Sequence, residues 1–465
     1  MLVMDAHVTA RKLRAAMRNG FGGSTLAPRE EGYDACRRVW NATADKYPAL
    51  LALCESPNDV AAAIRAAREV GVPLSVRGGG HQVAGLAVCD DGLTIDLSLM
   101  RSVTVAPDRK TAKAGGGSLL GDVDTGTQRE GLIVPAGVIS HTGLGGLALG
   151  GGVGWTCRHF GLTCDNIVAA DVVKADGTFM HATEEADPDL LWALRGGGGN
   201  FGVVTAFEMA VQPVTDVLFG QAVFPVEDLA RAVLHYRDAM LQAPDELTSV
   251  LVLRVAPELP AVPPELVGQP VAVINAVWSG ELSAGDKPVR ALIEAAQPAA
   301  FRIAPMPYLQ LQTMQDLLHP HGLRNYMKSR YLDRIDETAA RALLDATAKP
   351  AGDHSQIEVL RLGGAVERVD EDATAFANRQ TPFLVNVVAT WVEEHETAAH
   401  VEWARRTYAA LDCVGSDAGY VNFIDAEPDR VHSVYPGKTY DKLQQVKRRV
   451  DPDCLFRGNV PISPF

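Results

Sequence analysis

Apolar and polar residues alternate along the first 213 residues in a pattern that predicts short strands and helices joined by glycine-rich loops. Residues 58–70 (NDVAAAIRAAREV) repeat their apolar positions at helical spacing and are followed by Gly71, which predicts an amphipathic helix that ends there. Apolar or alternating runs predict strands in four segments: 73–76, 93–97, 166–173 and 203–211.

Beyond Pro213 glycine becomes rarer and longer helical patterns appear, with β-rich runs between them. Helices are predicted in three segments of this part: 229–239, 284–296 and 336–348. From about Gly415 the chain again contains glycine and aromatic residues. We therefore expect three regions, namely residues 1–213, 214–414 and 415–465.

The composition is typical of a folded protein with an acidic surface. Apolar residues make up 47% of the chain and charged residues 22%, which excludes a disordered or collagen-like chain. Lys and Arg number 43 and Asp and Glu 57, a net charge of −14, so we expect no nucleic-acid or membrane partner. No apolar run approaches the length of a membrane-spanning helix.

The N-terminus and the cysteines favour a cytoplasmic protein. Residues 1–23 are basic, have no apolar core of a signal peptide, and are expected to form at most a loosely attached helix. The seven cysteines are scattered without zinc-ligand spacing, so we expect reduced thiols and no metal site.

Glycine is concentrated in one part of the chain. Of 43 glycines, 26 lie between Gly78 and Gly202. Because glycine weakens regular elements, such a concentration indicates backbone that needs positive φ or approaches a ligand closely. Tight turns in a glycine-tolerant sheet are the alternative explanation. Four clusters stand out: 78–80, 115–117, 150–152 and 196–199.

The first cluster predicts an anion site. A predicted strand ends in Arg77 and runs into Gly78–Gly80, whose consecutive N–H groups can converge on a pyrophosphate. The motif is neither the GxGxxG turn of a dinucleotide-binding βαβ unit nor a P-loop. His81 follows directly, so it is either a ligand contact or, as lone histidines more often are, a structural residue.

Two further segments predict a flat ligand. Residues 135–167 alternate glycine with leucine, valine and tryptophan, and they are too apolar for a disordered linker. Residues 199–205 (GNFGVVT) lead into a predicted strand. Together with Gly78–Gly80, these loops could surround a large planar cofactor that carries a diphosphate.

Four motifs in this order resemble one family: residues 77–81 (RGGGH), 135–167, 194–204 (LRGGGGNFGVV) and 435–464. The chain is similar, from about residue 31 to 464, to the berberine-bridge-enzyme-like branch of the vanillyl-alcohol oxidase flavoprotein superfamily. The resemblance implies an α+β fold in which residues 1–213 and 415–465 form a two-part FAD-binding domain. Residues 214–414 are then an inserted substrate domain built on an antiparallel sheet.

The resemblance also implies how FAD is held. His81 matches the histidine that is bonded covalently to the flavin 8α-methyl group. Some members add a cysteine link two residues after the turn matched by residues 135–137; Ile139 stands there, so we expect one link only, with Cys157 and Cys164 as core thiols. The other expected flavin contacts are Arg77, Gly78, Gly79, Gly80, Gln82, Gly85, Gly137, Val138, His141, Thr142, Gly145, Gly146, Gly152, Gly154, Asn200, Gly202, Val203, Val204, Tyr420, Asn422 and Asn459.

Three residues are candidates for catalysis. Glu358 shares one face of a predicted strand with Gln356; it is either exposed or buried beside a ligand, where desolvation would raise its pKa and make it a base. The resemblance implies a Glu in this strand. It also places Thr142 near the flavin C4a edge, where a small residue admits oxygen, although Thr142 could simply bond its own turn. Lys328 is a second candidate, with a solvated lysine as the alternative.

The function implied is that of a flavoprotein oxidase acting on a small organic substrate, with O2 reduced to H2O2. A flavin-dependent monooxygenase acting on a polyketide-like substrate and a non-catalytic flavin-binding protein are the alternatives. Val252 stands where a relative's polar or aromatic substrate contact is expected, so the substrate is not identified by the sequence.

Overall fold

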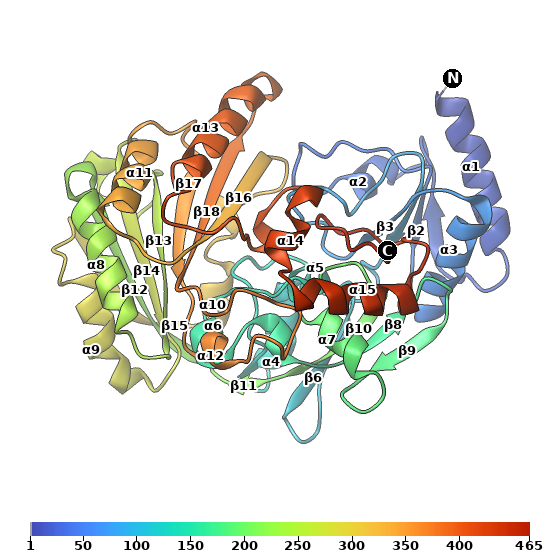
Figure 1. The fold of residues 1–465 in the computed structure, drawn as a ribbon, viewed down its shortest axis with the longest axis horizontal. Helices are drawn as coiled ribbons and strands as arrows, with labels where there is room; N and C mark the ends of the chain where they lie inside the picture. Colours follow the sequence, from blue (N-terminus) through green and yellow to red (C-terminus); the bar gives the residue numbers. More distant parts are fainter. Residues whose placement is uncertain (1) are drawn as a thin grey trace.

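The computed structural model describes residues 2–465, and the chain folds into two parts that lie side by side (Figure 1). The first part contains a four-stranded and a five-stranded sheet, and the second contains a single seven-stranded sheet. The C-terminal segment returns from the large sheet to the first part (Figure 1). This is the predicted α+β architecture.

The four-stranded sheet begins the chain. Its strands, in order across the sheet, are β1 (Ser24–Leu26), β2 (Leu50–Leu53), β4 (Leu93–Asp96) and β3 (Leu74–Arg77). Strands β2, β4 and β3 are parallel, and helix α3 (Pro57–Val70) precedes β3. The helix starts at Ser56, whose hydroxyl accepts the Asp59 N–H in a capping box, and it ends at Gly71 with φ of 74°.

Helix α1 (Leu2–Met17) is part of the core, which corrects the expectation of a loosely attached helix. Ala10, Leu13 and Met17 are buried in the cluster that also holds the apolar face of α3. A fully buried Leu or Met side chain stabilises a fold by about 1.5–3 kcal/mol. The basic residues of this segment occupy the opposite, solvent-facing side of the helix. In the sequence they made the apolar positions of the helix hard to recognise.

The five-stranded sheet is antiparallel and carries the glycine-rich loops. In order it contains β5 (Val103–Val105), β6 (Thr111–Gly115), β10 (Val203–Ala210), β8 (Ile167–Val173) and β9 (Phe179–Ala182). A short ribbon pairs β7 (Leu132–Ile133) with β11 (Gln212–Pro213). The helices of this part are α2 (Tyr33–Arg37), α4 (Leu120–Gln128), α5 (Leu144–Leu149), α6 (Cys157–Phe160) and α7 (Pro188–Leu194).

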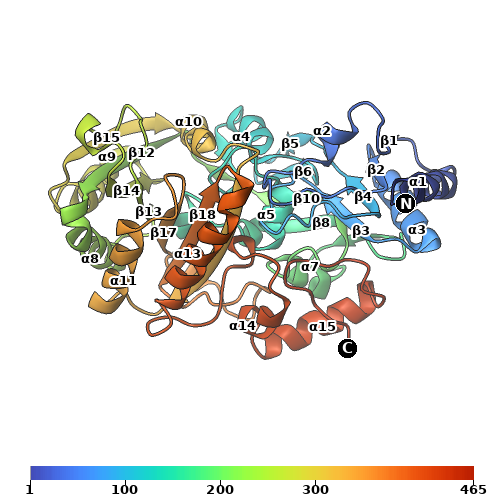
Figure 2. The same cartoon turned by 90° about the horizontal axis from the view of Figure 1, so that it is seen from above.

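The seven-stranded sheet is antiparallel throughout. Its order is β15 (Ala300–Pro307), β12 (Asp216–Pro225), β14 (Pro270–Trp278), β13 (Leu247–Val255), β17 (Gln356–Arg361), β18 (Phe383–Trp391) and β16 (Arg324–Leu332). Four helices cover its outer face (Figure 2): α8 (Leu229–Leu241), α9 (Leu282–Ile293), α11 (Glu337–Ala348) and α13 (Thr397–Ala409). Two shorter helices, α10 (Tyr308–Thr313) and α12 (Ala365–Arg368), lie in its connections.

Period-two alternation decides which side chains of this sheet reach the inside of the molecule. Ile357 and Val359 pack under the helices, and so do Val385 and Val387. Glu358 and Asn386 therefore point to the other face, toward the first part of the chain.

The C-terminal segment closes the first part. Helices α14 (Val431–Val434) and α15 (Lys438–Val450) precede a tail whose Phe456 joins the core beneath α1 and α3. Lys447 is fully buried, and its ammonium donates to Asp451 and to the carbonyls of Asn200 and Phe456. These bonds tie the tail to the turn before β10. Within residues 2–465, no helix has the length and apolar character to cross a bilayer.

Candidate functional site

A cavity of about 310 Å³ lies between the two parts of the molecule. One wall comes from the end of β3, the glycine run after it and the turn before β10. The tail residues 456–459 line one end, and the inner face of the seven-stranded sheet lines another, through Met327, Glu358, Asn386 and Val388. The cavity thus joins segments from all three predicted regions, whose boundaries at 213 and 414 remain predictions.

Most of the predicted site residues line this cavity. They are Gly78, Gly79, Gly80, His81, Gln82, Gly137, Val138, Thr142, Gly145, Gly146, Gly202, Val203, Val204, Asn422, Asn459 and Glu358. The structure places the others behind the wall or away from it: Arg77, Gly85, His141, Gly152, Gly154, Asn200, Tyr420 and Lys328.

The glycine run after β3 presents free donors. Within residues 2–465, the N–H groups of Gly78, Gly79 and Gly80 have no protein acceptor, and all three residues line the cavity. A side chain on Gly79 would collide with the backbone of Gly143. On Gly146 or Gly199, by contrast, a Cβ would project into open space. The loops therefore form a backbone-lined cradle that suits a diphosphate and a flat ring.

Arg77 and Gly85 support this run from behind. The Arg77 guanidinium lies 3.7 Å from the buried Asp96 carboxylate, yet its Nε and Nη1 atoms make no hydrogen bond in the described chain. Gly85 packs against Ala44 with a φ of 61°.

His81 lies on an aromatic platform. Its ring stacks on Trp40 with centroids 4.3 Å apart and planes 15° apart. Its Nε2 atom is buried without a partner, and the residue lines the cavity. Burial, with His141, His321 and His319 nearby, holds the pKa of His81 well below its usual range. The imidazole is therefore neutral at pH 7 and keeps a nitrogen lone pair.

Glu358 is fixed by two amide donors. Gln356 Nε2 donates to Oε1 at 2.8 Å, and Asn386 Nδ2 donates to Oε2 at 2.9 Å. Arg254, which can only donate, bonds Gln356 Oε1 at 3.0 Å and so fixes which end of that amide faces Glu358. Desolvation raises the pKa of Glu358, although Asn386, Gln356 and Arg254 oppose this shift. The result is a held carboxylate with a strengthened affinity for a proton.

Thr142, Val138 and Ile139 line the cavity on the loop that precedes α5. The backbone of Thr142, rather than its hydroxyl, makes the hydrogen bonds of the turn: its N–H donates to Ile139 and its carbonyl accepts from Leu120. Its side chain is thus available to the cavity. Cys157 and Cys164 are buried in the core, as expected for structural thiols.

The remaining predicted contacts hold the loops in place. The Tyr420 hydroxyl accepts the N–H groups of Gly152 and Val153 at 2.7 and 3.3 Å, and Asn422 donates to that hydroxyl and to the Leu147 carbonyl. Asn200 Oδ1 accepts from Gly458 at 3.1 Å, which joins the tail to the cradle.

Three more predicted residues contact the backbone or side chains of neighbouring segments. Asn459 donates to the carbonyls of Val421 and Ile424. Gly152 and Gly154 pack closely against Thr163 and Ala136, where a side chain would collide.

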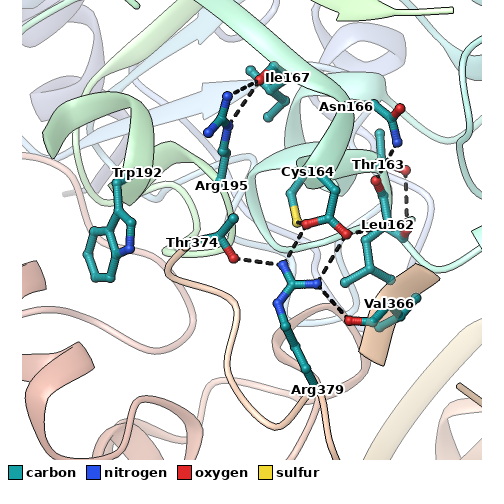
Figure 3. Close-up of polar contacts among 12 residues, drawn as sticks. Leu162, Thr163, Cys164, Asn166, Ile167, Trp192, Arg195, Val366, Thr374 and Arg379 are labelled. Atoms are coloured by element: carbon teal, nitrogen blue, oxygen red, sulfur yellow. Dashed lines mark hydrogen bonds and ion pairs between the residues drawn. The ribbon is translucent and has the colours of Figure 1, made fainter. Parts of the chain in front are cut away.

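A buried ion pair links the large sheet to these loops (Figure 3). Arg379, in the β17–β18 connection, is fully buried and donates to Asp165 at 2.5 Å, to Thr374 at 2.7 Å and to the Val366 carbonyl at 3.2 Å. Phe376 of the same connection packs on Gly151 and Gly196. The connection therefore presses on two glycine loops of the site.

Lys328 is not at the cavity. On β16 its neighbour Met327 faces the cavity, so Lys328 points the other way and pairs with Glu427 at 2.5 Å. Its ammonium also lies 4.6 Å from the Tyr408 ring centroid. This placement favours a structural role for Lys328 over the predicted catalytic one.

Sequence reasoning missed several lining residues. Trp40, His319, Met327, Asn386 and Val388 carry no local motif and reach the cavity only through the tertiary fold. Of these residues, Asn386 alone could have been noticed in the sequence, because it is a polar residue in the middle of a largely apolar run.

Two protein-family models match this chain. One described as "FAD binding domain" matches residues 48–183, and one described as "Berberine and berberine like" matches residues 419–463. The chain is 30% identical over 442 residues to an FAD-linked oxidoreductase of Dictyostelium discoideum, covering 94% of this chain and 93% of that protein. It is 28% identical over 463 residues to (R)-6-hydroxynicotine oxidase of Paenarthrobacter nicotinovorans, covering 95% and 97%.

Solved structures show the same fold. Superposition on 6-hydroxy-D-nicotine oxidase from Arthrobacter nicotinovorans gives a TM-score of 0.86 at 26% identity, covering 96% of this chain and 98% of that one. Glucooligosaccharide oxidase from Acremonium strictum, which carries a 6-S-cysteinyl, 8α-N1-histidyl FAD, gives 0.85 at 23% identity, covering 98% and 99%.

Proposed function

Because this chain belongs to the berberine-bridge-enzyme-like family of FAD-linked oxidoreductases, in the vanillyl-alcohol oxidase superfamily, we propose that it is an oxidase with FAD bound covalently to His81. It takes two electrons from a small organic substrate and passes them to O2, giving H2O2. The observation that carries the proposal is that one and the same cavity has His81 and the glycine cradle on one side and Glu358 on the other.

The residues present fit FAD. The free N–H groups of Gly78–Gly80 suit the diphosphate, and the open backbone at Gly146 and Gly199 admits a flat ring. The buried, unpartnered Nε2 of His81 marks a polar group that awaits a partner. When bound, FAD supplies the hydride acceptor and the reaction with O2.

Two features of the site support attachment through one residue. A neutral His81 is a nucleophile, and the stack on Trp40 restrains its ring. Ile139 lines the cavity where bicovalent relatives place cysteine, and it has no nucleophilic atom.

Glu358 is proposed as the base. Its two amide donors fix the carboxylate, while burial makes it a better proton acceptor than an exposed glutamate. It takes a proton from an O–H or N–H group on the carbon that loses hydride, and such a base contributes roughly 10²–10⁴-fold to rate. Thr142, small and exposed to the cavity, leaves room for O2.

The substrate is a small organic molecule, namely a secondary metabolite, an alcohol, an amine or a sugar-like compound, bound against the region of residues 214–414. The inner face of the large sheet offers it both polar and apolar contacts, through Glu358, Asn386, Met327 and Val388. We also propose a cytoplasmic location, supported by seven free cysteines, and no nucleic-acid partner, supported by the net charge of −14.

The test separates oxidase from oxygenase. Purified enzyme is mixed anaerobically with panels of alcohols, amines and sugars, and bleaching of the flavin absorbance identifies substrates. In air, an oxidase releases one H2O2 for each molecule oxidised. Oxygen incorporated into the product without stoichiometric H2O2 would instead support the monooxygenase, and a flavin that no substrate reduces would contradict the proposal.

A further inference from the structure

Three imidazole rings form a path from the cavity to the protein surface. The centroid of the His81 ring lies 5.0 Å from that of His141, which lies 4.8 Å from that of His321. His81 and His141 are partly buried, whereas His321 is exposed to solvent. His81 Nε2 and His141 Nδ1 make no hydrogen bond in the described chain, and at these separations a small rotation of either ring brings the two rings within reach of each other.

The path is assembled from three distant segments. His81 follows the glycine run, His141 lies in the loop before α5, and His321 lies just before β16 of the large sheet. The platform residue Trp40 joins them, because its Nε1 donates to the His319 carbonyl at 3.0 Å and its carbonyl accepts the Gly322 N–H at 3.2 Å. The His321 segment is thereby held over His81.

The segment that carries His141 is also held in place. Asp316 accepts the N–H and the hydroxyl of Ser140, the residue before His141, at 2.9 and 2.5 Å. His141 Nδ1 is nevertheless buried without a partner, as is His81 Nε2. Two adjacent rings with unused nitrogens are the arrangement that proton transfer needs.

The rings are neutral at pH 7. Burial and His321 lower the pKa of His141, while Asp316 opposes this; burial and Arg77 lower the pKa of His321. A neutral imidazole carries one proton and one lone pair, so each ring can accept a proton and pass one on. Among residues 2–465, no group of three metal-binding side chains has the arrangement of a metal site.

We propose that His141 is the base for covalent attachment of FAD to His81, and that His321 passes the released proton to solvent. The inference rests on the proposed attachment at His81. In that reaction His81 forms a bond from an imidazole nitrogen to the flavin 8α carbon. His81 gives up its own ring proton, which goes to the neighbouring His141. One C–H bond of the methyl group breaks as the C–N bond forms, and O2 takes up the electron pair left on the ring system together with two protons, giving H2O2.

The test follows covalent flavin and needs no substrate. Wild type and His141→Ala are purified, saturated with FAD, and sampled over time for flavin that remains with the chain after acid precipitation. We expect full attachment in wild type. In the variant FAD should bind reversibly and attach about 10²-fold more slowly. His321→Ala should show a smaller slowing. Added imidazole, which fits the space left by the ring, should accelerate attachment in His141→Ala.

His159→Ala is the matched control. His159 is also half-buried and stacks on an aromatic ring, Phe160, but its Nδ1 pairs with the Ser279 hydroxyl at 3.0 Å and its ring does not belong to the path from His81 to His321. The His159→Ala variant should attach FAD fully, and added imidazole should not change its rate of attachment. Attachment in His141→Ala at the wild-type rate would overturn the inference alone. Loss of FAD binding in both His141→Ala and His141→Gln would also overturn it, because His141 would then serve binding. Absence of covalent flavin in wild type would overturn the proposed function itself.

Discussion

At the scale of single residues, the central question is what Glu358 does. Glu358→Gln keeps the shape of the side chain but removes the proton acceptor. Flavin reduction by substrate under anaerobic conditions should slow by about 10²–10⁴-fold, whereas the oxygen reaction of the pre-reduced enzyme should stay near the wild-type rate. Stopped-flow absorbance measures both half-reactions. Unchanged reduction at saturating substrate would make Glu358 a binding residue.

Substitution of Thr142 should affect the other half-reaction, the reoxidation of the flavin by O2. Thr142→Leu adds bulk at a cavity-lining position whose hydroxyl is not needed by the turn. Reoxidation by O2 should slow while anaerobic reduction stays nearly intact. Thr142→Ser, which keeps the position small, is the control and should reoxidise like wild type. If the leucine variant reoxidises equally fast, oxygen reaches the flavin by another route.

At the scale of elements, the β17–β18 connection should act as a structural brace. Arg379→Met leaves Asp165 buried without its partner, which costs about 3–5 kcal/mol in comparable pairs. The thermal midpoint should fall and reversible FAD binding should weaken, because Phe376 would no longer press on Gly151 and Gly196.

The matched control for this brace is Arg290→Met, which removes an exposed pair with Asp286 on α9 and should change the midpoint little. The double variant Asp165→Asn, Arg379→Met should recover part of the loss, since no buried charge is left. Equal midpoints for Arg379→Met and Arg290→Met would contradict the role of the brace.

The elements that could be predicted from the sequence are those whose signal is local. Residues 58–70 have helical spacing and are followed by Gly71, which together predicted α3. Glu358 stands in a strand whose alternation decides which face its side chain occupies. Trp40, His319 and Asn386 reach the site from remote segments, so no spacing links them to it. Lys328 was misleading because the face of β16 it occupies depends on sheet packing.

At the scale of the whole molecule, the two parts meet at a buried carboxyl group. Asp124 of α4 accepts from Gln312 of α10 at 3.0 Å, and Gln312 also donates to the Gly137 carbonyl. Burial raises the pKa of Asp124 to about 7, against about 3.9 in an unfolded chain. The folded state therefore binds this proton more tightly, and its stability falls as pH rises from about 4 to about 7.

Asp124→Asn should remove that contribution, because the amide has no proton to lose. The variant should therefore gain stability relative to wild type: its free energy of unfolding minus that of wild type should increase as pH rises from about 4 to about 7 and then level off. Urea unfolding at a series of pH values measures the difference. Parallel curves for the two proteins would show that Asp124 does not titrate in this range.

The measurement that tests the account most directly is the mass of one peptide. Trypsin cleaves after Arg77 and Arg101, so His81 lies in the peptide of residues 78–101. In wild type this peptide should carry the mass of FAD less two hydrogens, and fragmentation should place it on His81. The peptides that contain Cys157 and Cys164 should be unmodified, and His81→Ala should release its FAD on acid precipitation. Flavin found on a peptide that contains Cys157 or Cys164, or only dissociable flavin in wild type, would contradict the account.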